Sequence, residues 1–313
     1  MDHIHKATVF HTGRRLFVAG FSLVELAVVL FIVSLLFGVF AGASSGFLQG
    51  KSIEADRAKL RAIETAIASF VSVNGRLPCP ADGSLASTNA SVGTEVRDAN
   101  GDCTAGIDQK TGVVPWTSLA ITEADAADSY QRRITYRVAY GLARNSAMDF
   151  TACDPAGTGT ADIPATSTSL CSSAACLAVC RTTCINSDLS LCTPPSAVLA
   201  ATRGVLVRSG LASDATSIIL MDNSVSPTQG AAYVLVAHGK NGAGAYNLSS
   251  GVLTAGTAGD KEAQNANNQI MNGWYAVDAD YNESGGSGNY DDLVLRASIM
   301  KVVMQAQRGP RAH

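Results

Sequence analysis

The sequence predicts an α+β protein in which one long N-terminal α-helix packs on an antiparallel β-sheet that carries a cysteine-rich insertion. Three observations lead to this fold class. An apolar run over residues 21–41 continues into an amphipathic segment, and no proline interrupts the chain before Pro78. Short apolar, β-prone runs recur along the second half of the chain. Six of the eight cysteines lie close together within residues 151–195, amid serine, threonine and alanine.

The apolar run is long enough to cross a membrane as a helix. It is apolar except for Ser22, Glu25 and Ser34, and about 20 such residues span a bilayer. The preceding basic residues favour a cytoplasmic position for residues 1–20. An ordinary signal peptide or anchor is the simplest alternative. The length of the run, the lack of an A-x-A cleavage site and the acid near its start argue against that alternative.

The junction between leader and apolar run resembles a known processing motif. The residues Gly20, Phe21, Ser22, Leu23, Val24 and Glu25 are similar to the cleavage and methylation motif of type IV prepilins and type II secretion pseudopilins. This resemblance implies that prepilin peptidase removes residues 1–20 by cutting after Gly20. It also implies that Phe21 becomes an N-methylated mature terminus. Glycine suits the cleavage position because it leaves the backbone unhindered.

In this family an acid stands at the fifth mature position, which here is Glu25. Cleavage creates an ammonium on Phe21 one helical turn away from that carboxylate. A lone acid at the membrane is costly unless it is paired. Glu25 could pair with its own terminus or with that of a neighbouring subunit. In the second case joining a filament would relieve the cost, and Glu25 would direct assembly.

From Lys51 onward the helix is predicted to become amphipathic. The apolar positions recur at helical spacing and form one stripe, consisting of Ile53, Leu60, Ile63, Ile67 and Phe70. One helix is therefore predicted over residues 21–73, with residues 21–41 in the membrane or filament core. Asn74 and Gly75 end it. The globular domain is then expected to cover residues 74–313.

Four glycines repeat every four residues between the two halves of this helix: Gly38, Gly42, Gly46 and Gly50. Small residues at this spacing permit close packing between helices. The same glycines lower helix propensity and could form a zone that stretches or unwinds. A glycine-rich membrane boundary without a specific role is the third interpretation, and the sequence does not choose among them.

The cysteines all follow the apolar run, and their number is even. If the run is an anchor, they lie together on its outer side, where disulfides persist. The abundance of glycine, with 29 in 313 residues, also suits a loop-rich extracytoplasmic domain. The formal net charge of −3 shows no basic excess, so no nucleic-acid partner is expected.

The segment GRLPCPADG at 75–83, followed by GVVPWTSLAI at 112–121, resembles a group of large minor pilins and pseudopilins with Leu-Pro-Cys-Pro and Pro-Trp segments. A disulfide between Cys79 and Cys103 would close a loop between them. We favour this bond over metal binding because no second cysteine pair lies nearby. Trp116 is expected to anchor the core under the helix.

The insertion at residues 151–195 contains Cys153, Cys171, Cys176, Cys180, Cys184 and Cys192. Its spacing is compatible with zinc, but no histidine lies near and the gaps do not match paired CxxC knuckles. A disulfide-stapled insertion with little core of its own is favoured instead. The pairing of these six cysteines stays open.

Strands are predicted within residues 133–143, 202–210, 217–222 and 231–239. The glycine-rich segment 237–245 lacks the spacing of a phosphate-binding loop and is read as a turn. The last segment, 294–307, is expected to be a strand or a short helix.

An acidic loop at residues 274–298 offers closely spaced oxygen ligands. Its candidate calcium ligands are Asp278, Asp280, Asn282, Asp291 and Asp292, with Glu283 beside them. Calcium takes six to eight oxygens from a pliable loop. The order differs from an EF-hand, but the region loosely resembles the C-terminal calcium loop of major pseudopilins. A solvated acidic turn is the alternative, and no cofactor is required in either case.

Enzymatic activity is not expected. Outside the leader and the last residue, His238 is the one histidine, and no GxSxG motif is present. A lone histidine before glycine is more often structural.

The sequence therefore predicts a structural subunit of a type IV pilus or a type II secretion pseudopilus. Its large domain favours a minor subunit, because such a domain would crowd an array of identical copies. Other pilin or pseudopilin subunits, prepilin peptidase and the bacterial inner membrane are the expected partners. The domain would lie in the periplasm and, after assembly, on a surface filament. The alternative is a signal-anchored periplasmic or surface adhesion domain that does not polymerise.

Overall fold

The computed structural model describes residues 22–99, 101–103, 112–144, 147–148, 199, 201, 203–254, 260–267, 274–283 and 288–308. The chain divides into two compact units, Met1–Lys51 and Ser52–His313. Three predicted features lie outside the described residues: the leader with Gly20, the mature terminus Phe21, and the six cysteines of the insertion.

Helix α1 covers Leu23–Asn74. In the second unit three residues of the predicted stripe are buried, with Leu60 3% exposed and Ile63 and Ile67 fully covered, whereas Ile53 and Phe70 are partly buried and the neighbouring Val71 is fully covered. The buried residues recur at three or four positions, so one face of the helix enters the core. The helix stops at Gly75, which has a φ of +64° and donates its N–H to the Val71 carbonyl oxygen at 2.8 Å. A glycine in this conformation satisfies the last carbonyls of the helix.

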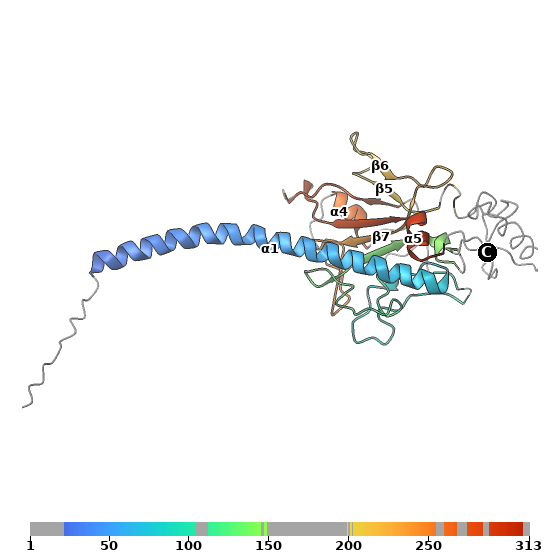
Figure 1. Ribbon diagram of the computed structural model, residues 1–313, viewed down its shortest axis with the longest axis horizontal. Helices are drawn as coiled ribbons and strands as arrows, with labels where there is room; N and C mark the ends of the chain where they lie inside the picture. Colours follow the sequence, from blue (N-terminus) through green and yellow to red (C-terminus); the bar gives the residue numbers. More distant parts are fainter. Residues whose placement is uncertain are drawn as a thin grey trace, which may run out of the picture. The chain divides into compact units, whose positions relative to one another are not determined.

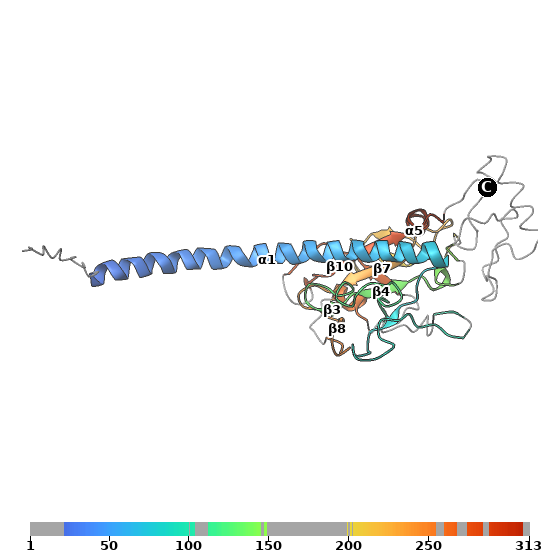
Figure 2. The same cartoon turned by 60° about the horizontal axis from the view of Figure 1, so that its bottom comes forward.

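A five-stranded sheet lies against this part of α1 (Figures 1 and 2). In spatial order its strands are β1 (Ala81–Asp82), β2 (Gly112–Val113), β4 (Thr135–Val138), β7 (Ala231–Ala237) and β10 (Leu293–Ser298). All neighbouring pairs are antiparallel. Every residue of β7 is buried, which explains its continuous apolar sequence. The predicted α+β class and antiparallel sheet are confirmed.

Two smaller sheets and three short helical segments complete the described fold. The sheets contain β3 (Arg132–Arg133) with β8 (Tyr246–Asn247), and β6 (Ile219–Met221), β5 (Leu206–Arg208) and β9 (Tyr275–Val277) in that order. The helical segments are η1 (Tyr140–Leu142), α4 (Asp260–Asn265) and α5 (Ile299–Gln305). Strands β5 and β9 are parallel, so the antiparallel arrangement does not extend to this sheet.

The predicted strand at 133–143 is wrong in its extent. The chain leaves β4 after Val138 and forms the turn η1. Gly141 in this turn lies against the guanidinium of Arg203, where a Cβ would come within 1.9 Å of its Nη1. The turn itself is closed by backbone hydrogen bonds from the Leu142 N–H to the Ala139 carbonyl oxygen at 2.8 Å and from the Ala143 N–H to the Tyr140 carbonyl oxygen at 3.1 Å. The segment 294–307, predicted as a strand or a short helix, contains one of each: strand β10 is followed directly by helix α5.

The predicted disulfide between Cys79 and Cys103 is confirmed, with a Cα–Cα distance of 5.3 Å. Both cysteines belong to the same buried cluster as the apolar stripe of α1. Trp116 is also in this cluster and is 5% exposed. The predicted core role of Trp116 is thus confirmed.

Two buried acids lie close to each other: Asp56 on α1 and Asp128 in the loop before β3. Asp56 accepts hydrogen bonds from the Ser129 backbone N–H at 2.6 Å and from its hydroxyl at 2.7 Å. Asp128 accepts from the backbone N–H groups of Tyr130 and Arg132, both at 2.9 Å. Burial, together with the nearby Asp56 charge, raises the pKa of Asp128 from 3.8 to about 6. The folded state therefore holds a proton on Asp128 that the unfolded chain releases at lower pH.

This pair predicts that the protein loses stability as pH rises from about 4 to about 6, because the unfolded chain binds fewer protons there. Asp128→Asn should raise the free energy of unfolding at about pH 7.5 by at most about 3 kcal/mol and flatten its pH dependence. Urea unfolding of the full chain in detergent measures both effects. Asp125→Asn is the matched control, since the Asp125 carboxylate is exposed and Thr122 hydrogen bonds lower its pKa. Identical pH profiles for wild type and Asp128→Asn would contradict this account.

Candidate functional site

The start of α1 presents an apolar surface over residues 22–38. Every residue from Ser22 to Gly38 is exposed within this unit. The large apolar residues are highly exposed to solvent: the exposed fraction is 85% for Leu23, 67% for Phe31 and 71% for Phe37. Exposed apolar surface on this scale marks a site for a membrane or for another protein. No helix among the described residues combines the length and the apolar character that a membrane span requires.

Glu25 stands in the first turn of this helix and interacts with Ser22. The Ser22 hydroxyl accepts a hydrogen bond from the Glu25 backbone N–H at 3.2 Å. In return, the Ser22 backbone N–H donates to Glu25 Oε2 at 3.4 Å. This reciprocal arrangement is a capping box, which satisfies two otherwise unpaired donors at the helix start. Glu25 therefore has a local structural role that the sequence analysis did not recognise, although the S-x-x-E spacing signals it.

A second candidate site is a buried group of three carboxylates, formed by Glu262, Asp291 and Asp292. One oxygen from each lies within 4.8 Å of the others. Glu262 comes from α4, whereas the two aspartates immediately precede β10. Among the described residues this is the single cluster of three or more histidine, cysteine or acidic side chains with the spacing of metal ligands.

Hydrogen bonds hold part of this carboxylate cluster in place. Glu262 Oε1 accepts from Asn289 Nδ2 at 2.9 Å and from the Asp291 backbone N–H at 2.8 Å. Glu262 Oε2 accepts from Asn241 Nδ2 at 2.8 Å. The Oδ1 atoms of Asp291 and Asp292 are both buried; Asp291 Oδ1 has no hydrogen-bond partner within the described structure, whereas Asp292 Oδ1 lies 3.5 Å from His238 Nδ1. Burial and the nearby Glu262 raise the pKa of Asp291 to about 6.

His238 connects this cluster to the five-stranded sheet. Asn267 Nδ2 donates to Thr135 Oγ1 at 2.6 Å, which leaves the threonine proton available for His238 Nε2, also at 2.6 Å. With Nε2 accepting, Nδ1 carries the hydrogen and faces Asp292 Oδ1 at 3.5 Å. All of these groups are buried. The His238 ring is therefore held inside the protein between Thr135 and Asp292.

The structure separates the candidate calcium ligands into different environments. Asp291 and Asp292 join Glu262, as described above. Asp278 instead forms an ion pair with Arg296 on β10. Asp280 lines an open pocket, where Asn282 Nδ2 donates to the Gly288 carbonyl oxygen at 2.8 Å. Glu262 was not among the predicted ligands. It is 29 residues away from Asp291 in the sequence, and the Asp291 backbone N–H donates a hydrogen bond to it.

No family model matches the chain, and neither a curated protein nor a solved structure does.

Proposed function

We propose that the chain is a structural subunit of the pilin type, in a type IV pilus or a type II secretion pseudopilus. The observation that carries this proposal is the start of α1, where residues 22–38 are exposed and apolar except for Ser22, Glu25 and Ser34, and where Glu25 follows the Gly20-Phe21 junction by four residues in the sequence. These exposed apolar side chains favour apolar surroundings. Insertion into a membrane, and then among the helices of other subunits, would supply them.

In this proposal prepilin peptidase removes residues 1–20, and the new Phe21 ammonium becomes a partner for a Glu25 carboxylate. The helix holds the subunit in the inner membrane until it enters the filament. The second unit, Ser52–His313, then lies in the periplasm or on the filament surface. Its size supports a minor subunit. The disulfide between Cys79 and Cys103 is consistent with an oxidising compartment.

Crosslinking in intact cells tests the proposal. Formaldehyde treatment followed by purification of this chain should recover other proteins that carry the same N-terminal motif, identified by mass spectrometry. Deletion of the prepilin peptidase should remove these products. A chain that yields no crosslink to any such protein, with the peptidase present, would favour the anchored adhesion domain that does not polymerise.

We further propose that the cluster of Glu262, Asp291 and Asp292 binds calcium. The buried Asp291 Oδ1, which has no hydrogen-bond partner within the described structure, supports this, because a cation would compensate carboxylates that repel one another. Asn241 and Asn289 already satisfy Glu262 in part, so calcium would add to an existing polar network. Water would have to complete the coordination.

Calcium is therefore expected to raise the melting temperature of the chelator-treated full chain. At a hundredfold excess over the dissociation constant the gain is about 2.7 kcal/mol, or about 5–10 °C for a domain of this size. Asp291→Asn should abolish the shift, whereas the exposed Asp125→Asn should retain it. A wild-type melting temperature that calcium leaves unchanged would refute the site.

A further inference from the structure

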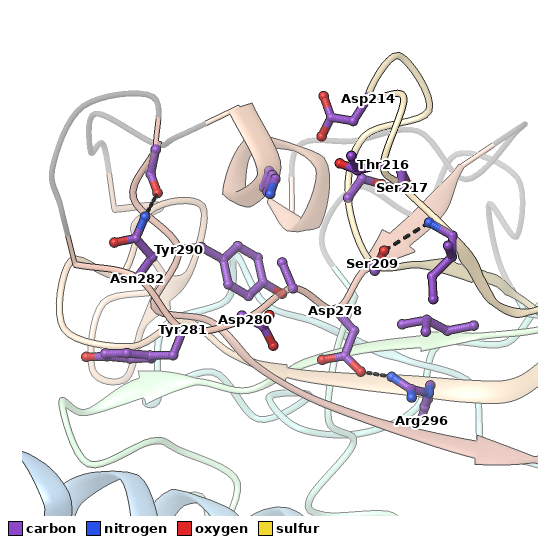
Figure 3. Close-up of a pocket in the computed structure, with 16 residues that line it drawn as sticks. Ser209, Asp214, Thr216, Ser217, Asp278, Asp280, Tyr281, Asn282, Tyr290 and Arg296 are labelled. Carbon is purple, nitrogen blue, oxygen red and sulfur yellow. Dashed lines mark hydrogen bonds and ion pairs between the residues drawn. The ribbon is translucent and has the colours of Figure 1, made fainter.

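A pocket of about 730 Å³ opens between the β5–β6 hairpin and the loop that follows β9 (Figure 3). Its volume is within the range of small-molecule sites. In this view Asp214, Thr216 and Ser217 lie on the hairpin side of the pocket, and Asp280 and Tyr281 lie on the loop side. Lys261 on α4 and Arg296 on β10 add two cations to the lining.

Internal hydrogen bonds fix the hairpin wall of the pocket. Ser217 Oγ donates to the Gly210 carbonyl oxygen at 3.0 Å, and Ser209 Oγ accepts from the Ile218 N–H at 3.0 Å. Asp214 Oδ2 accepts from the Leu211 N–H at 3.1 Å. On the opposite side, the ion pair between Asp278 and Arg296 uses one carboxylate and one cation of the lining. These side chains already bond to other groups of the protein, so they define the walls of the pocket and have little capacity left to bind a ligand.

Three other polar groups remain available to a ligand. The Asp280 carboxylate, the Lys261 ammonium and the Thr216 hydroxyl have no hydrogen-bond or ion-pair partner within the part of the chain that the structure describes. Beside Asp280, the Tyr281 side chain is 41% exposed. Its hydroxyl donates to Glu283 Oε1 at 2.6 Å, which restrains the ring. The pocket thus combines an acceptor, two donors and an accessible aromatic face.

The charges of the lining narrow the class of ligand. Three carboxylates (Asp214, Asp278 and Asp280) stand against two cations (Lys261 and Arg296). This balance disfavours phosphates and other anions. The polar walls also disfavour purely apolar molecules, which would leave the polar groups desolvated and unpaired. A neutral molecule with many hydroxyl groups and a flat apolar face meets both constraints.

We propose that this pocket binds a neutral saccharide. Asp280 accepts hydrogen bonds from sugar hydroxyls, and Lys261 and Thr216 donate to sugar oxygens. The C–H face of the sugar ring packs on Tyr281. This site lies entirely within the second unit and does not depend on the assembly proposed for α1.

Saturation-transfer NMR on the full chain in detergent tests the proposal. The probes are D-galactose, D-mannose and N-acetyl-D-glucosamine, with sialic acid as the anionic comparison. At least one neutral sugar should receive saturation and sialic acid should not. The signal should persist in EDTA, which separates this site from calcium binding. A parallel arm with immobilised neutral oligosaccharides distinguishes free sugars from a surface glycan.

Matched variants locate the binding in the pocket. Tyr281→Ala, Asp280→Asn and Lys261→Met should each weaken binding about tenfold, as the loss of one charged or stacked contact predicts. Tyr130→Ala, Asp125→Asn and Lys240→Met remove the same side chains outside the pocket lining and should bind like wild type. Transfer to none of the neutral sugars, or transfer that all three pocket variants retain, would overturn the proposal. Preferential binding of sialic acid would overturn it as well.

Discussion

Glu25→Ala is expected to reduce the crosslinked yield between this chain and its filament partners by at least about tenfold. In the assembled helix bundle, loss of the carboxylate would leave the Phe21 ammonium of a neighbouring subunit without its partner. An uncompensated charge in an apolar setting is strongly destabilising. The formaldehyde products from intact cells give the yield, and mass spectrometry confirms that each variant is still cleaved after Gly20.

The capping box formed by Ser22 and Glu25 allows two variants that separate the charge of Glu25 from its role as a helix cap. Glu25→Gln keeps a side chain that can accept from the Ser22 N–H, but it removes the charge. Ser22→Ala keeps the charge and removes the cap. If Glu25 acts through its charge, Glu25→Gln fails to assemble and Ser22→Ala assembles. The opposite pattern would show that Glu25 acts merely as a helix cap.

Arg133→Met is expected to cost about 3–5 kcal/mol of folding free energy, the largest effect on stability among the predicted substitutions. Arg133 is fully buried. Its guanidinium donates to Glu123 Oε1 at 2.7 Å and to the carbonyl oxygens of Gly83 and Leu248, both at 2.8 Å. It therefore ties together three loops that are distant in sequence. Methionine fills the volume but leaves these buried acceptors without donors.

Two comparisons make this prediction specific. Arg133→Lys keeps the charge but loses the planar fork, so it should recover less than half of the loss. Arg57→Met removes an exposed arginine that pairs with Glu54 on the surface of α1 and should cost less than about 1 kcal/mol. Urea unfolding of the full chain in detergent measures all three. An Arg133→Met protein within about 1 kcal/mol of wild type would contradict the proposed role of this network.

The local features of this fold are readable from the sequence, and the non-local ones are not. The stripe of Ile63 and Ile67 and the end of the helix at Gly75 follow from spacing and glycine conformation, which involve only near neighbours. The buried run of β7 is equally local. After β4 the chain turns, and the Leu142 carbonyl oxygen accepts from the N–H of Leu77, a residue distant in sequence, at 3.0 Å. No periodicity within residues 133–143 contains that information.

The candidate sites follow the same rule. Asp291 and Asp292 stand out as adjacent acids in a loop, and Glu25 as a lone acid in an apolar run. Glu262 joins the carboxylate cluster because α4 is brought against the start of β10, a contact that the sequence of α4 does not signal. In the sequence, Arg133 likewise appears as one residue of a β-prone run. Its hydrogen bonds to Glu123, Gly83 and Leu248 exist because folding brings those distant segments around it.

The mass of the mature N-terminal peptide tests the central claim most directly. The chain is purified from the membrane fraction of cells that contain prepilin peptidase and digested, and its N-terminal peptide is identified by mass spectrometry. The proposed function predicts a peptide that begins with N-methylated Phe21. An intact Met1, or a cut beyond Ala41, would contradict it and leave Glu25 as a helix-capping acid in an ordinary anchor or signal.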